Sequence, residues 1–359
     1  MISSHVDHVL ENMKRQGISQ MLVTDPYAVY YLTDYLTDPK ERFLGLYLNA
    51  DGNHVLFLNN LFFQTRDLGV KEVRFSDTDP VMQIVSEYIH PGEVLGIDKC
   101  MQARFLIPLM AHAKASDYVL SSLCIDMARA IKDASEIEKM VEASRINDLA
   151  MEKLKALIHP GVTEIEIADQ LKAIYQNLGA SDNSFDPIVA FGENGADGHH
   201  MPDDTVLSEG QSIIFDVGCL KDGYCSDMTR TFFYQTVSEK HRKIYELVQK
   251  AQQAAVEAIR PGIPICQIDK IARDIISAEG YGKNFNHRLG HFIGMEVHEY
   301  GDVSCANETL LQEGMIFSIE PGIYLTGEMG VRIEDLVVVT KDGCMRLNHY
   351  PRELEIIHP

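Results

Sequence analysis

The sequence has 359 residues with 45% hydrophobic content, which is enough for one large domain or two ordinary domains with well-filled cores. Its 53 acidic and 32 basic residues give a formal net charge of −21, which would repel a nucleic acid backbone, so we expect no nucleic acid partner. Because the N-terminus lacks the features of a signal peptide and no apolar run approaches the roughly 20 residues of a membrane span, we expect a soluble, cytoplasmic protein with no membrane partner.

The first third of the chain alternates strand and helix patterns. Residues 20–24 are typical of a strand, and Asp25 and Pro26 then suit the N-cap and first turn of a helix. Within residues 42–60, two apolar runs flank an Asp-Gly pair, which predicts a β-hairpin. Similar patterns continue to about residue 124. We therefore predict a compact α/β domain in this part of the chain.

A long helical pattern separates this domain from the rest of the chain. Apolar residues recur near helical spacing between Ile137 and Leu154, and a Pro-Gly pair ends the run. We place the boundary just before this pattern. The prediction is an N-terminal α/β domain at residues 1–128 and a C-terminal domain at residues 129–359.

The C-terminal domain contains an internal repeat. Residues 207–218 (LSEGQSIIFDVG) align without gaps on residues 311–322 (LQEGMIFSIEPG), sharing the Leu, the Glu-Gly pair and the final Gly. Upstream, residues 157–171 resemble residues 258–272 around a shared Pro-Gly pair. A chance match at a common turn is the alternative. Agreement in two separate segments favours a duplicated helix-helix-hairpin unit whose halves face each other across an approximate two-fold axis.

The first hairpin, residues 215–227 (FDVGCLKDGYCSD), places two carboxylates in apolar surroundings. A two-residue turn at Lys221 and Asp222 would make Asp216 and Asp227 direct cross-strand neighbours, with β-carbons about 5 Å apart. Two like charges so close in an apolar setting repel strongly, so either one pKa rises or a cation lies between them. We favour a metal cation.

The second hairpin repeats this arrangement. Gly327 lies midway between Glu320 and Glu334, so these glutamates are also expected to face each other. The four acids could instead be separately solvated, but each lies in an apolar run, which favours metal binding. Four carboxylates and one imidazole suit two divalent ions, most simply Mn²⁺, with Co²⁺, Fe²⁺ or Zn²⁺ as alternatives. Such a pair of ions activates water and polarises a carbonyl, which is the chemistry of hydrolysis.

Two histidine-rich stretches accompany the acids. A His-x-x-x-His spacing in residues 286–302 could be a helical zinc pair, but the glycines there favour a twisted strand with close backbone approach. A lone histidine is commonly a satisfied core residue, whereas three beside the carboxylates favour ligation or catalysis. In residues 191–204 we expect at least one histidine to point into a cleft beside the carboxylates. The candidates in the two stretches are His287, His291, His298, His199 and His200.

From about Arg129 to the C-terminus, the sequence resembles the pita-bread metallopeptidases, a family that includes prolidase (Xaa-Pro dipeptidase), aminopeptidase P and methionine aminopeptidase. The resemblance lies in the segments FDVG and SDMTRTF, GHFIGMEVHE, SIEPGIY, and GVRIED. It implies a C-terminal pita-bread α+β domain with pseudo-two-fold duplicated halves. It also implies five metal ligands, namely Asp216, Asp227, His291, Glu320 and Glu334.

The same resemblance implies roles for further residues. The segment GENGADGHHMP matches the family loop G-x-N-x-A-x-x-H-x-x-P, which selects His199 rather than His200 as the substrate-side histidine. Glu320 would act both as ligand and as general base or proton shuttle. The implied catalytic residues are Glu320, His199 and His298. The implied substrate-binding residues are Arg288, Arg332 and His287.

The N-terminal domain resembles the creatinase/prolidase type and indicates the proline-specific branch, because methionine aminopeptidases generally lack it. Residues 37–42 (TDPKER) resemble the DPHER loop of short bacterial prolidases, a region that can reach toward the partner subunit, which implies a homodimer. The sequence departs from the family pattern at Lys40, where the loop has histidine, and at Phe292, where a glycine is usual.

Arg288 bears on the choice between two branches of the family. The segment HRLGH resembles prolidase, whereas aminopeptidase P usually has glycine at the position of Arg288. A dipeptide presents a carboxylate beside the scissile bond, and an arginine can hold it bidentately; a surface or structural cation is the alternative. The resemblance therefore implies a two-metal Xaa-Pro dipeptidase. Aminopeptidase P activity on longer peptides and a non-catalytic pita-bread peptide-binding protein are the alternatives.

Overall fold

The computed structural model describes residues 1–358, which divide into two compact units. Unit 1 comprises Met1–Arg129, and unit 2 begins at Ala130 and continues along the rest of the chain. This division lies one residue beyond the boundary that we predict from the sequence. Within residues 1–358, no helix has both the length and the apolar character needed to span a membrane.

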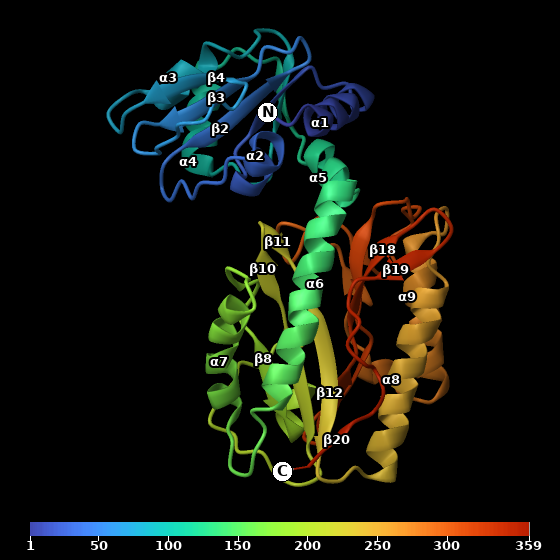
Figure 1. Ribbon diagram of the computed structural model, residues 1–359. Helices are drawn as coiled ribbons and strands as arrows, with labels where there is room; N and C mark the ends of the chain where they lie inside the picture. Colours follow the sequence, from blue (N-terminus) through green and yellow to red (C-terminus); the bar gives the residue numbers. More distant parts are fainter. Residues whose placement is uncertain (359) are drawn as a thin grey trace. The chain divides into compact units, whose positions relative to one another are not determined.

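Unit 1 is built on a six-stranded sheet with the order β4-β3-β2-β1-β5-β6 (Figure 1). Strands β1, β2 and β3 pair antiparallel, whereas β4, β5 and β6 join in parallel. Such a mixed sheet with helices confirms the predicted α/β class. The elements are α1 (Ser3–Arg15), β1 (Gln20–Val23), α2 (Pro26–Thr33), β2 (Leu44–Asn49), β3 (Val55–Asn59), β4 (Lys71–Phe75), α3 (Val81–Ser86), β5 (Val94–Ile97), α4 (Ala103–His112), β6 (Asp117–Leu120) and α5 (Leu123–Ala130).

Two local predictions in unit 1 are confirmed. Asp25 caps α2, because its Oδ1 accepts a hydrogen bond of 3.0 Å from the backbone N–H of Tyr27. Pro26 occupies the first turn, where a backbone N–H would have no hydrogen-bond partner within the helix, so the missing N–H of proline costs nothing. The hairpin expected in residues 42–60 consists of β2 and β3, which pair antiparallel.

Unit 2 consists of two halves, each with two long helices and an antiparallel strand pair (Figure 1). In the first half, α6 (Ala134–Lys155) and α7 (Glu164–Asn177) share a hydrophobic core with β9 (Ser212–Val217) and β12 (Met228–Tyr234). In the second half, the core is formed by α8 and α9 with β15 and β18. Their bounds are Glu239–Glu257, Ile265–Ala278, Ile316–Ile319 and Asp335–Val339.

Shorter strands and 3-10 helices complete unit 2. They are β7 (Asp182–Asn183), β8 (Ile188–Phe191), η1 (Gly192–Ala196), β10 (Cys219–Lys221), β11 (Tyr224–Cys225), η2 (Gly282–Asn284), β13 (Gly290–His291), β14 (Asp302–Val303), β16 (Gly322–Leu325), β17 (Met329–Arg332), β19 (Cys344–Arg346) and β20 (Ile356–Ile357).

The structure confirms the duplication that the sequence repeat predicts. Helices α7 and α9 begin at aligned positions, and the residue before each forms an isolated antiparallel bridge. These bridges join Thr163 to Val206 in the first half and Pro264 to Leu310 in the second. The four residues correspond in the alignment, so helix start, bridge and hairpin recur as one unit in each half.

The predicted register of the second hairpin is confirmed, whereas that of the first is wrong by two residues. Glu320 and Glu334 lie opposite each other between the pairs Ile319–Asp335 and Gly322–Arg332. In the first hairpin, Asp216 pairs with Thr229 instead of Asp227.

The turn of the first hairpin explains the error. The loop consists of Asp222 and Gly223, because Lys221 pairs with Tyr224. Both loop residues have positive φ, 51° and 80°, as a two-residue type I′ turn requires. Since side chains alternate with a period of two, a shift of two residues keeps both aspartates on the same face. They are diagonal neighbours and not direct ones.

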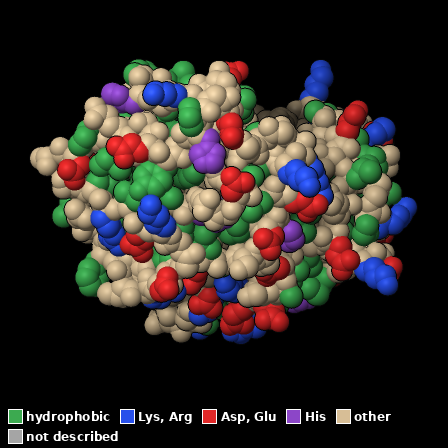
Figure 2. Space-filling model, turned by 90° about the horizontal axis from the view of Figure 1, so that it is seen from above, with side chains coloured by type: hydrophobic (Ala, Val, Ile, Leu, Met, Phe, Trp, Pro, Cys, Tyr) green, Lys and Arg blue, Asp and Glu red, His purple; other side chains and the backbone are tan. Residues whose placement is uncertain are grey.

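Charged side chains of both signs are exposed on the surface. On the face shown in Figure 2, Asp and Glu side chains are interspersed with Lys and Arg. Exposed pairs such as Arg145–Glu142 and Lys270–Asp274 occur in unit 2. Each such pair contributes about 0–1 kcal/mol to stability, so the fold depends far more on buried groups.

One buried ion pair joins the two halves of unit 2 to the C-terminal segment. Nη2 of Arg230 in β12 lies 2.7 Å from Oδ1 of Asp335 in β18, and both side chains are almost fully buried. The same guanidinium donates to the carbonyls of Tyr350 and Pro351. Asp335 also pairs with Arg346 and Arg352. This cluster fixes β18, and with it the adjacent Glu334.

We predict that Asp335→Asn lowers the free energy of unfolding by about 3–5 kcal/mol, because it leaves the buried charge of Arg230 without its partner. Burial alone would raise the pKa of Asp335, but the charges of Arg230, Arg352 and Arg346 hold it below its ordinary value. The pair's contribution is therefore present above the ordinary aspartate pKa and is lost as pH falls through the lowered pKa.

Urea unfolding at pH 7 and at progressively lower pH measures this effect. Asp342→Asn, an exposed carboxylate, is the matched control. An Asp335→Asn midpoint equal to that of the control at pH 7 would contradict the role given to the buried pair.

Candidate metal centre

Four acidic side chains lie at corresponding ends of the two hairpins. Asp216 lies in β9 and Asp227 directly precedes β12, while Glu320 directly follows β15 and Glu334 directly precedes β18. Asp227 and Glu334 form a buried group with His291, in which the possible ligand atoms all lie within 4.8 Å of one another. The duplicated hairpins thus bring together acids from both halves of unit 2.

His291 reaches this group from β13, through a close backbone contact. A β-carbon added at Gly290 would lie 1.9 Å from the carbonyl oxygen of Ser318, so only glycine permits the approach. His291 N donates a hydrogen bond of 3.0 Å to Ser318 Oγ. This arrangement confirms the close backbone approach that we predict for this segment, although the strand itself covers only Gly290–His291.

The imidazole of His291 faces the acids through Nε2. Nε2 lies 3.5 Å from Oδ2 of Asp227 and 3.6 Å from Oε1 of Glu320. Nδ1 lies 3.2 Å from the carbonyl oxygen of Phe292, which favours a proton on Nδ1 and a lone pair on Nε2. The ring is therefore oriented as a metal ligand would be.

Three of the carboxylates each have one buried oxygen that accepts no hydrogen bond from the described part of the chain. Within residues 1–358, no hydrogen-bond partner is present for Oδ1 of Asp216, Oδ1 of Asp227 or Oε1 of Glu334. The second oxygens of Asp216 and Glu334 accept hydrogen bonds of 2.6 Å and 2.7 Å, respectively. Unsatisfied buried oxygens are costly. Because they converge beside an imidazole, they fit divalent cations.

The electrostatics of the cluster also favour bound cations. Burial, followed by repulsion from Asp216 and Glu320, raises the pKa of Asp227 well above its ordinary value. Burial, followed by repulsion from Asp227, Glu320 and Asp216, raises that of Glu334. Protein groups alone therefore do not neutralise the cluster. Divalent cations would do so, and a set of oxygens with one nitrogen suits ions of the Mn²⁺ type.

Arg332 lies behind Asp216 and is almost fully buried. Its guanidinium donates to Oδ2 of Asp216 at 2.6 Å, to Oγ1 of Thr229 at 3.0 Å and to the hydroxyl of Tyr324 at 2.9 Å. The resemblance implies substrate binding for this residue. In the structure its donors are directed at protein groups, and one of these groups is Asp216, a predicted metal ligand.

His287 is connected to the same group of residues. Its Nε2 lies 3.1 Å from the hydroxyl of Tyr324, and its Nδ1 lies 2.6 Å from the carbonyl oxygen of Arg288. Burial lowers the pKa of His287, and the charge of Glu320 opposes that shift. Tyr324 thus links His287 to Arg332. Sequence reasoning missed Tyr324, although it lies within the family segment SIEPGIY.

The remaining substrate-side candidates lie at the exposed edge of the cluster. His298, Arg288 and His199 are all exposed. The rings of His298 and His291 lie with centroids 4.3 Å apart. Partial burial lowers the pKa of His298 to about 4, with further contributions from the neighbouring His291 and Arg288, while the charge of Glu320 opposes the shift. These residues therefore lie within electrostatic range of one another.

The two departures from the family pattern have different surroundings. Phe292 is buried in the core of the second half, where its ring packs 5.5 Å from that of Phe317. Lys40 belongs to unit 1, is exposed, and pairs with Asp38 at 2.5 Å. Phe292 consequently alters core packing behind β13 and leaves the ligand set unchanged.

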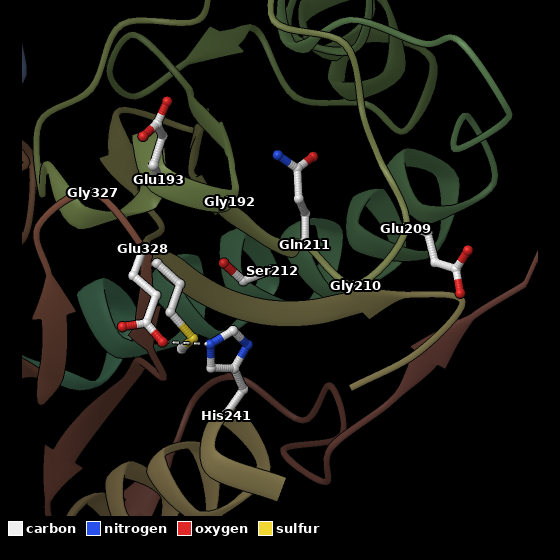
Figure 3. A pocket seen from close by; sticks show the side chains of 10 residues that line it. Gly192, Glu193, Glu209, Gly210, Gln211, Ser212, His241, Gly327 and Glu328 are labelled. Carbon is white, nitrogen blue, oxygen red and sulfur yellow. Dashed lines mark hydrogen bonds and ion pairs between the residues drawn. The ribbon is translucent and has the colours of Figure 1, made fainter. Parts of the chain in front are cut away.

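Unit 2 also contains a pocket with a different lining (Figure 3). It lies between η1, the start of β9, the start of α8 and the β16–β17 turn, and it has a volume of about 320 Å³. His241 and Glu328 pair across it at 2.9 Å. The carboxylates of Glu193 and Glu209 point away from this pair (Figure 3). Because its acids do not converge, this pocket is a poorer candidate than the ligand cluster.

Comparison with known families agrees with this geometry. Residues 138–341 match the family described as Metallopeptidase family M24, and residues 5–131 match the Creatinase/Prolidase N-terminal domain. The chain belongs to metallopeptidase family M24. It is therefore a peptidase of a metal-dependent family, with the two-domain architecture expected from the sequence.

Solved structures similar to this M24 member cover nearly its whole length. Prolidase from Pyrococcus furiosus is 32% identical, with a TM-score of 0.86 over 95% of this chain and 99% of that one. Dipeptidase PepE from Mycobacterium ulcerans is 32% identical, with a TM-score of 0.93 over 99% and 98%. X-Pro aminopeptidase from Thermotoga maritima is 27% identical, with a TM-score of 0.83 over 97% and 100%.

We predict opposite effects of Asp227→Asn on the metal-free and the Mn²⁺-loaded protein. In metal-free protein the substitution removes a buried, repelled acid, so the free energy of unfolding should rise by about 0.5–2 kcal/mol. Because the folded pKa of Asp227 is raised, its ionisation costs stability as pH rises above the ordinary aspartate value. The gain should therefore be larger at pH 7 than at pH 4.

With Mn²⁺ present, the wild type should gain stability by mass action and the variant should gain much less. Calorimetric melting temperatures with and without Mn²⁺, together with bound metal per chain, measure both effects. The exposed Glu313→Gln is the control. Equal Mn²⁺-dependent increases in wild type and Asp227→Asn would contradict a ligand role for Asp227.

Proposed function

We propose that this metallopeptidase is a dinuclear Xaa-Pro dipeptidase of the Mn²⁺ type. The observation that carries the proposal is the buried group of Asp227, Glu334 and His291, with Glu320 3.6 Å from His291. Three buried carboxylate oxygens of the cluster have no partner within residues 1–358. Further support comes from relatives named prolidase and dipeptidase, which align along almost the full chain. The proposed substrate is an Xaa-Pro dipeptide.

Five residues would hold the two ions in this proposal. When bound, the ions would supply Lewis-acid polarisation of the scissile carbonyl and activation of water. Arg332 contributes by orienting Asp216, since its guanidinium bonds to that carboxylate at 2.6 Å. The proposed ligands are Asp216, Asp227, His291, Glu320 and Glu334.

Glu320 is the proposed general base and proton shuttle. Its side chain is more exposed than those of Asp227 and His291, at 16% compared with 5% and 6%. Oε1 accepts a hydrogen bond of 3.1 Å from Ser318 Oγ, which leaves Oε2 to receive a proton from the attacking water. The same oxygen can then deliver the proton to the leaving nitrogen of proline.

The exposed edge residues would bind the substrate. With its pKa lowered to about 4, His298 is neutral at pH 7, and a neutral imidazole can donate one ring N–H to the substrate carbonyl. His199 would contact the substrate from the first half of the unit. Arg288 would hold the carboxylate of the dipeptide.

Oligomeric state and location also form part of the proposal. The resemblance of residues 37–42 to a loop that reaches the partner subunit supports a homodimer, and a cytoplasmic location completes the proposal. An aminopeptidase acting on longer Xaa-Pro peptides is the second candidate. The similarity to an X-Pro aminopeptidase favours it, although the identity is lower, at 27%.

We predict that metal-stripped protein reloaded with Mn²⁺ cleaves an Xaa-Pro dipeptide with a higher kcat/KM than the Xaa-Pro-Xaa tripeptide of the same first residue. A preference for the tripeptide would favour the aminopeptidase. Absence of both activity and bound metal would favour a peptide-binding protein. The measurement is the initial rate against substrate concentration for both peptides.

Arg288→Ala should raise KM for the dipeptide about 10-fold to 100-fold, because the free carboxylate loses a charge-assisted contact. The tripeptide should be affected less, since its carboxylate lies one residue farther from the scissile bond. Lys283→Ala, which removes an exposed cation from η2, is the control. Equal losses on both peptides would contradict carboxylate binding by Arg288.

A further inference from the structure

Each substrate-side histidine of the proposed function is followed directly by a residue whose side chain makes a close polar contact with a buried side chain. His200, next to His199, places Nε2 2.6 Å from Oε2 of Glu164, and the side chains are 13% and 0% exposed. Oε2 of Glu299, the residue after His298, lies 3.0 Å from Nζ of Lys132, and the two side chains are 4% and 1% exposed. Both halves of unit 2 therefore anchor the chain one residue after an exposed histidine.

Glu164 holds the first of these loops at several points. Its Oε1 accepts hydrogen bonds from the backbone N–H of Phe191 at 2.6 Å and from Nδ2 of Asn194 at 3.0 Å. Its Oε2 accepts from the backbone N–H of Asp203 at 3.2 Å, in addition to the contact with His200. One buried carboxylate thus connects both ends of residues 191–203, the loop that carries His199.

The duplication shows that the fold itself does not require a carboxylate at this position. Glu164 is the first residue of α7, and the aligned first residue of α9 is Ile265, which is equally buried. Both make the same backbone contact, from Glu164 N to Thr205 O and from Ile265 N to Thr309 O. Because a buried charge is costly, the glutamate is explained by the loop it binds and not by the helix it begins.

His199 depends on this anchoring for its orientation. Its side chain is exposed, and its backbone N–H donates to Oδ1 of Asp197 at 3.0 Å. The direction of its ring is therefore governed by the backbone of residues 197–200. The contact between His200 and Glu164 fixes the C-terminal end of that segment.

We propose that His200 is a positioning residue, which through its contact with buried Glu164 fixes the backbone that presents His199 to the substrate. This inference rests on the proposed function for the role of His199. It assigns different tasks to two adjacent histidines, one that contacts the substrate and one that holds the loop.

Hydrogen exchange tests the holding of the loop without reference to activity. In metal-free, full-length protein, His200→Ala should accelerate exchange of the backbone amides across residues 191–203. Glu164→Gln should do so less, because its amide oxygen still accepts hydrogen bonds. Glu166→Gln, an exposed residue two positions along α7, is the matched control and should leave this loop unchanged. Unchanged exchange in His200→Ala would overturn the proposal.

Kinetics test whether the held loop acts through His199. His200→Ala should lower kcat/KM about 10-fold, and His200→Asn, which retains an N–H donor, should recover part of the loss. In the His199→Ala background, adding His200→Ala should cause little further loss. Equal fold-losses in both backgrounds, or no loss in the wild-type background, would overturn the positioning role.

The two arms separate this inference from the proposed function. The kinetic arm uses whichever Xaa-Pro peptide the wild type cleaves, so a preference for the tripeptide changes the proposed function and leaves this test intact. A wild type inactive on both peptides would contradict the proposed function and the link to substrate. The exchange result would still decide whether His200 holds the loop.

Discussion

Repulsion among buried carboxylates is the constraint on which the rest of unit 2 depends. Asp216, Asp227 and Glu334 are drawn together from two hairpins, and burial with mutual repulsion raises the pKa of Asp227 and of Glu334. Arg332 offsets the charge of Asp216, and Thr229 satisfies one oxygen of Glu334. The remaining oxygens require cations, and only a rigid frame can hold them at this separation. The buried Arg230–Asp335 pair and the two separate cores provide that frame.

The duplication provides the acids symmetrically, but the groups around them are not symmetric. Each half contributes two carboxylates at corresponding hairpin ends, whereas His291 comes from the second half alone. The anchors also differ, since Glu164 in one half corresponds to Ile265 in the other. A duplicated fold can thus supply a nearly symmetric metal site while each half specialises its loops. An asymmetric peptide requires that difference, because its amino and carboxyl ends must be recognised by different groups.

Local sequence patterns predicted the register of one acidic hairpin correctly and that of the other incorrectly, and the difference has a physical cause. The register of Glu320 and Glu334 followed from the Gly327 apex, whereas the first hairpin turns at Asp222 and Gly223, one residue beyond the predicted turn. The period of two in a strand preserved the shared face of the aspartates despite that error. The burial of Arg332 behind Asp216 and of Phe292 in the core could not be predicted, because each depends on packing between segments distant in sequence.

The adjacent histidines show why residue type and spacing define a site only in part. Neither periodicity nor composition separates His199 from His200, and family resemblance was needed to choose between them. In the structure, Glu164 distinguishes them, because a buried carboxylate can satisfy only the imidazole that faces inward. The ring of His199 is exposed, whereas that of His200 is held against Glu164. The sequence therefore identifies candidate groups, while the buried partner that distinguishes between them becomes visible only after the chain has folded.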